Sequence, residues 1–216
     1  MQEEPSFRRL GAALRLSRSS ALWQGGEADA RKHCMDVSPY SPAVRGLLSE
    51  GRLPPLGPGT PNEAVRAILE GLTVESLFAP APVRRQDFAK GCLAGLWLFH
   101  DFLDESHQLS QSIATPEGSY WHGLMHRREP DYANAAYWFR RVGKHPVFAA
   151  LPAAAEELAA QAPAGTQVPS PWDPFWFIDY CEACAQEREP GEHFARLLQQ
   201  REWELLFAYC YRRATE

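Results

Sequence analysis

Histidine and carboxylate side chains gather in the middle of the chain, between residues 93 and 148. Five of the seven histidines fall in this stretch. Imidazole and carboxylate groups bind divalent metals, and imidazole gains or loses its proton near neutral pH. The stretch is therefore the first candidate for a functional site, and its candidate polar residues are His100, Asp104, Glu105, His107, Glu117, His122 and His126.

The spacing of these residues follows the period of an α-helix. His100, Asp104 and His107 are separated by four and three residues. At about 100° per residue they lie within roughly 60° of one another on a helix. His122 and His126 form a second pair, four residues apart. If the two helices face each other, these five side chains could hold a divalent metal ion such as zinc, manganese, nickel or iron(II).

A structural explanation of the same residues stays open. His100, Asp104 and His107 continue an apolar stripe that contains Leu93 and Leu96, so the row is expected to be buried. A buried polar group without a partner costs on the order of 1–3 kcal/mol, and these side chains could simply bond to one another. One class of function is thus a protein, an enzyme included, that binds a small molecule or a divalent metal at a buried His/Asp cluster. The competing class is a non-catalytic helical binding or interaction module with a structural polar core.

Helix signals surround this stretch and define the fold class. Thr115, Pro116 and Glu117 predict the start of the helix that carries His122 and His126. The pattern over residues 85–105 predicts one central helix, and no strand-like alternation occurs. We expect an all-α fold with a single irregular domain of roughly seven to nine helices. This domain spans residues 60–216, and residues 1–59 form an extended, weakly structured N-terminal arm that could wrap around it.

Composition and charge narrow the classes of function. The chain has 216 residues, of which 45% are hydrophobic and 23% charged, the balance of an ordinary globular protein. A net charge of −5 argues against a nucleic-acid partner. No apolar run reaches the length of about 18 residues that a membrane helix needs. Five cysteines form no regular disulfide framework, which indicates a reducing, cytoplasmic setting.

Two further motifs have alternative explanations. Cys181 and Cys184 could form half of a zinc site or a redox pair, but packing of two core cysteines is the simpler explanation. A local basic group consists of Arg127, Arg128, Arg140, Arg141, Lys144 and His145. It could bind an anion or phosphate, although pairing with nearby carboxylates is more common for arginines at helix ends.

Residues 88–148 contain the strings HDFLDESHQLSQS and GSYWHGLMHRREPDYANAAYWFRRVGKHPVF. This segment resembles an uncharacterised family of helical proteins, with a weaker similarity in WDPFWFIDYCEAC. The resemblance implies a recurring helical module. It implies no activity, cofactor or catalytic residue.

Overall fold

The computed structural model of the chain describes residues 35–49 and 51–216. No strand occurs among them, and the predicted all-α class is confirmed. The α-helices are α2 (Pro42–Leu48), α3 (Arg66–Glu70), α4 (Val74–Phe78), α5 (Gln86–Phe99), α6 (Leu103–Gln111), α7 (Pro116–Arg128), α8 (Tyr132–Val142), α9 (Leu151–Glu157), α10 (Pro174–Ala185) and α11 (Glu192–Thr215). Three short 3-10 helices lie between them, η2 (Glu63–Val65), η3 (Pro146–Ala149) and η4 (Ala159–Gln161).

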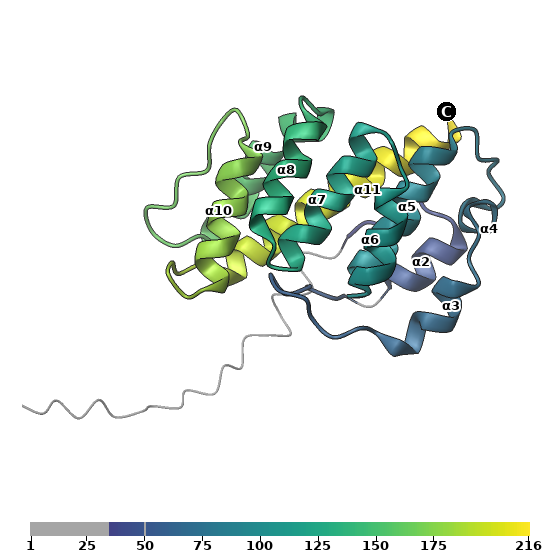
Figure 1. Cartoon of the computed structure of the whole chain (residues 1–216), viewed down its shortest axis with the longest axis horizontal. Coiled ribbons are helices and arrows are strands. Elements are labelled where there is room, and N and C mark those ends of the chain that lie inside the picture. Colours follow the sequence, from purple (N-terminus) through teal and green to yellow (C-terminus); the bar gives the residue numbers. More distant parts are fainter. Residues whose placement is uncertain (1–34, 50) are drawn as a thin grey trace, which may run out of the picture. The chain divides into compact units, whose positions relative to one another are not determined.

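Helix α7 is the central element of the helical unit (Figure 1). Every residue from Glu117 to Arg128 is buried, and the helix packs against α5, α6 and α8. Its predicted start is confirmed, because the Thr115 hydroxyl accepts a hydrogen bond from the Gly118 N–H and Pro116 is the first helical residue. A helix buried on all sides carries its polar side chains into the interior, here including His122.

Two glycines allow neighbouring segments to approach α7 closely. A Cβ atom on Gly118 would lie 2.1 Å from the carbonyl oxygen of Ile113, and one on Gly123 would lie 2.9 Å from the ring of Phe139. Only a residue without a side chain fits at such positions. The two glycines thus set the distances at which the α6–α7 turn and α8 pack on the central helix.

The predicted continuous helix over residues 85–105 is wrong. Helix α5 ends at Phe99, and α6 begins only at Leu103. Between them Asp101 adopts a φ of 64°, in the left-handed region, and its carboxylate accepts hydrogen bonds from Arg128 at 2.5 Å and from Arg52 at 2.6 Å. The buried Arg128 and the half-buried Arg52 hold the turn that separates the two helices.

A second buried ion pair ties α7 to α11. The guanidinium of Arg127 donates to the carboxylate of Glu202 at 2.6 Å, and the hydroxyl of Tyr120 donates to the same carboxylate at 2.9 Å. Both charged side chains are at most 1% exposed. Arg127 and Arg128 of the basic group are thus both paired within the molecule, Arg128 with Asp101 and Arg127 with a carboxylate 75 residues away in the chain.

The described residues that precede α3 belong to the same folded unit as the helices that follow. Helix α2 buries Val44, Leu47 and Leu48. After it, the carbonyl groups of Leu53 and Pro54 accept hydrogen bonds from Arg196 of α11, and others in this segment are bound by Gln199 and Arg128. Of the expected arm over residues 1–59, the structure therefore describes only residues 35–49 and 51–59. Its first 34 residues lie outside the described residues.

Residues Met35–Glu216 cluster as one compact unit, and α11 runs along the back of it in the view of Figure 1. Within the described part of the chain, no helix combines the length and apolar character needed to cross a membrane.

Candidate metal centre

Three imidazoles meet where α6 packs on α7. His107 comes from α6, while His122 and His126 are neighbours one turn apart on α7. One nitrogen atom from each ring can be chosen so that all three lie within 4.8 Å of one another. The ring centroids are separated by 4.5 Å, 4.6 Å and 5.2 Å. This trio, called the histidine triad below, is the one group of three or more potential metal ligands within the described residues.

Ser110 fixes the orientation of His122. The Ser110 hydroxyl donates to the carbonyl oxygen of His107 at 3.2 Å, and its oxygen lies 3.2 Å from Nδ1 of His122. Since the hydroxyl proton is used in the first contact, Nδ1 of His122 is the donor in the second. The Nε2 atom of His122 then keeps its lone pair. The ring of Trp138 packs on this imidazole at 4.1 Å between centroids and shields it from solvent.

Glu129 and Asn134 orient His126 in a similar way. A carboxylate oxygen of Glu129 lies 2.9 Å from Nδ1 of His126, so Nδ1 carries the proton and donates it. A carboxylate behind the imidazole is the outer contact that typically orients a metal-bound histidine and makes it a better ligand. The Nε2 lone pair of His126 accepts from the Asn134 amide at 3.1 Å. A metal ion at Nε2 would have to displace this amide.

The buried imidazoles are uncharged at neutral pH. Burial lowers the pKa of His122 to about 3, and the neighbouring His126 and His107 contribute to the decrease. Burial also lowers the pKa of His126, against the opposing attraction of Glu129. Neutral imidazole is the form that binds a metal. His122 and His126 therefore do not have to lose a proton when a metal binds.

His107 is the half-buried member of the triad and provides its route to solvent. Ligand nitrogens about 2.0–2.1 Å from a tetrahedral zinc lie about 3.3 Å apart, which is closer than the 4.8 Å limit of the triad. Of the three rings, the half-buried His107 has the most room to adjust to the spacing of a zinc site. Three imidazoles around zinc leave a fourth position for water or a small ligand, as in catalytic zinc sites.

The other predicted site residues lie elsewhere. His100 is buried at the end of α5, where its Nδ1 lies 3.3 Å from the Asn62 amide nitrogen. Asp104 is exposed on the first turn of α6. The helix break at Asp101 explains the separation, since His100 and His107 do not share one helix. The structure therefore brings together three of the five predicted ligands and no aspartate.

The two predicted glutamates have separate partners. Glu105 accepts a hydrogen bond from Arg66 at 2.7 Å. Glu117 is buried at the start of α7, with an oxygen 3.7 Å from Nε2 of His145. Neither belongs to the histidine triad.

Sequence reasoning missed the side chains that surround the triad. Ser110 follows His107 by three residues and Glu129 follows His126 by three, so helical spacing alone could have identified both. Asn134 and Trp138 come from α8, and only the packing of α8 on α7 brings them near.

The cysteine pair on α10 fits the packing explanation. Cys181 and Cys184 are buried and reduced, and the described residues place neither in a group of metal ligands. Burial raises the pKa of the Cys181 thiol to about 12, so the thiolate that metal binding or redox exchange requires is disfavoured.

Comparison of the chain with protein-family models, with curated proteins and with solved structures gives no match. The geometry of the histidine triad is thus the basis for any functional assignment.

Proposed function

We propose that the protein binds one divalent metal ion through His107, His122 and His126, and that zinc is the ion that fits best. The observation that carries this proposal is the outer hydrogen bonding of the triad. Ser110 and Glu129 each accept the Nδ1–H of one imidazole. This leaves the Nε2 lone pair of His122 for a ligand, and that of His126 once a metal displaces the Asn134 amide.

The choice of zinc follows from the imidazole ligands of the triad. Neutral imidazoles bind zinc, copper, nickel and iron, whereas magnesium and calcium prefer oxygen ligands, and the triad contains no carboxylate. A bound zinc with three protein ligands would polarise a water molecule or a small ligand at its open position. His107 lies on the solvent side, so a small molecule would reach the ion past this residue.

A structural polar core is the second candidate function, and the Asn134 contact favours it. The Asn134 amide already occupies the Nε2 atom of His126, and Trp138 covers His122. In this case the triad would fix how α6, α7 and α8 pack, and the protein would act as a helical binding module without a metal.

The Asn134→Ala variant separates the two functions. If a metal displaces the amide, this variant binds zinc more tightly than wild type, because no hydrogen bond has to be broken. If the triad is only a structural core, the variant loses stability and still binds no metal. Isothermal titration with zinc, manganese, nickel and iron(II), on protein purified without an affinity tag, distinguishes these outcomes.

The control for ligand identity is the pair His122→Gln and His193→Gln. The first variant removes a triad ligand, and the second removes an imidazole from α11 that is not part of the triad. We expect wild type and His193→Gln to bind one zinc per chain and His122→Gln to bind at least tenfold more weakly, a loss of about 1.4 kcal/mol. Equal affinity in all three proteins would refute the proposed site.

A further inference from the structure

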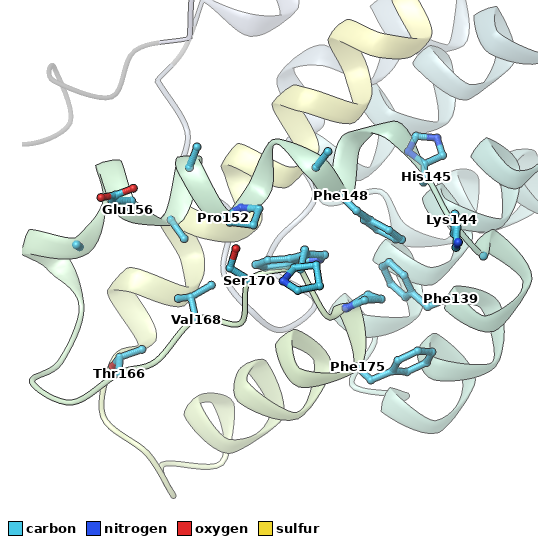
Figure 2. A pocket seen from close by; sticks show the side chains of 18 of the residues that line it. Phe139, Lys144, His145, Phe148, Pro152, Glu156, Thr166, Val168, Ser170 and Phe175 are labelled. Carbon is cyan, nitrogen blue, oxygen red and sulfur yellow. The ribbon is translucent and has the colours of Figure 1, made fainter.

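A large apolar groove lies apart from the histidine triad. It has a volume of about 1430 Å³ and runs between η3, α9, the loop over residues 162–173, and the facing ends of α8 and α10. None of the three triad histidines lines it. Figure 2 shows Phe139, Phe148 and Phe175 together at one end, with Pro152 and Val168 along the middle.

Several small apolar side chains line the groove. Ala149, Ala153 and Ala159 line it and are exposed, although they are apolar. The volume exceeds the roughly 300–1,000 Å³ of an ordinary small-molecule pocket, as expected for an open groove that takes an elongated ligand. Trp172 in the wall also carries a buried indole N–H that has no hydrogen-bond partner among the described residues.

The two ends of the groove differ in charge. Arg140 and Lys144 lie at the phenylalanine end, whereas Glu156 lies at the opposite end (Figure 2 shows Lys144 and Glu156). Both cations are exposed, and neither forms an ion pair with a described residue. They contrast with Arg127 and Arg128 of the same basic group, which are buried and paired. Arg140 and Lys144, which line the apolar groove, are thus two members of the basic group without an ion-pair partner among the described residues.

The turn after α8 places Lys144, next to Arg140, at the groove. Gly143 ends α8 with a φ of 63°, and the chain then passes through Lys144 into η3. The Arg140 guanidinium carbon lies 5.9 Å from the centroid of the Phe175 ring on α10. A positively charged end and an apolar stretch therefore lie next to each other in one groove.

We propose that this groove binds an amphipathic anion, a molecule with an elongated apolar body and a carboxylate or phosphate head. The head lies between Arg140 and Lys144, and the body extends along the alanines toward Val168. Glu156 sets the direction, because it would repel an anionic head at its own end.

The test uses four probes that share one apolar chain, below the concentrations at which they form micelles. Dodecanoate and dodecyl phosphate carry an anionic head, dodecyltrimethylammonium a cationic head, and dodecanol no charge. Isothermal titration of the full chain should show binding of both anions, with affinity that falls as salt rises. The relative affinity of the two anions tells whether a carboxylate or a phosphate head fits better. Equal binding of the cationic probe, or no binding of either anion, would refute the proposal.

Two pairs of variants localise the binding. Arg140→Gln with Lys144→Gln should weaken dodecanoate binding by about tenfold or more, since two charge-assisted contacts are lost. Arg84→Gln with Lys90→Gln changes the net charge equally, away from the groove, and should leave binding unchanged. Ala153→Trp should fill the groove and abolish binding, whereas Ala160→Trp, exposed on η4 outside the lining, should not. Binding that survives Ala153→Trp would place the ligand elsewhere and overturn the inference.

Discussion

The buried imidazole of His122 should make the stability of the metal-free protein depend on pH. Its pKa is about 3 in the folded protein, because the ring is only 1% exposed and lies beside His126 and His107. In the unfolded chain a histidine has a pKa of about 6.5. The unfolded state therefore binds a proton between these two values that the folded state does not.

The sign and size of the effect follow from this difference. Stability is fully present above the unfolded pKa and decreases as the pH falls from about 6.5 toward the folded pKa. At about 1.4 kcal/mol per pH unit, His122 alone lowers the free energy of unfolding by about 2 kcal/mol between pH 7.5 and pH 5. His126, whose pKa is also lowered, adds to the decrease.

Urea unfolding with a chelator present, at several pH values from about 7.5 to 5, measures this effect. We expect the His122→Gln variant to show a pH dependence smaller by about 1–2 kcal/mol over this range, because glutamine does not titrate. The His193→Gln variant is the control for removal of a histidine outside the triad. Parallel curves for wild type and His122→Gln would refute the account, since they would mean that His122 is accessible to water and protonates freely in the folded protein.

Three predictions concern residues on, or packed against, the two helices that carry the triad. Glu202→Ala should lower the free energy of unfolding by about 3–5 kcal/mol, because it leaves the buried Arg127 guanidinium unpaired; a change below about 1 kcal/mol in chemical denaturation would contradict this. Gly118→Ala should cost about 1–3 kcal/mol, because its Cβ would meet the Ile113 carbonyl oxygen, and an unchanged melting temperature would argue against that close approach. Asp104→Ala should cost at most about 1 kcal/mol, the value of a carboxylate near the start of a helix, and a larger loss in urea unfolding would show that Asp104 is buried after all.

The start of α7 could be predicted from sequence because its signals are local. Thr115 and Pro116 specify the first turn through their own backbone geometry and hydrogen bonding, whatever the rest of the chain does. The same holds for Asp173 and Pro174 at the start of α10. Helical spacing also placed His122 and His126 correctly on one face of α7.

The break between α5 and α6 could not be predicted in this way. The left-handed turn at Asp101 depends on Arg52 and Arg128, which are 49 and 27 residues away in the chain. No local pattern marks such a partner, and the residues around the break have the spacing of a continuous helix. For this reason helical spacing groups His100 with His107, although the structure places His100 beside Asn62.

The central claim is that three imidazoles bind one zinc ion, and X-ray absorption of the zinc-loaded protein tests it most directly. The account predicts a first shell of nitrogen or oxygen at about 2.0–2.1 Å, with the outer-shell scattering of three imidazoles. The same spectrum for His126→Gln should lose one imidazole or the metal altogether. A first shell containing sulfur at about 2.3 Å, or one with fewer than two imidazoles in the wild type, would contradict the histidine triad as the metal site.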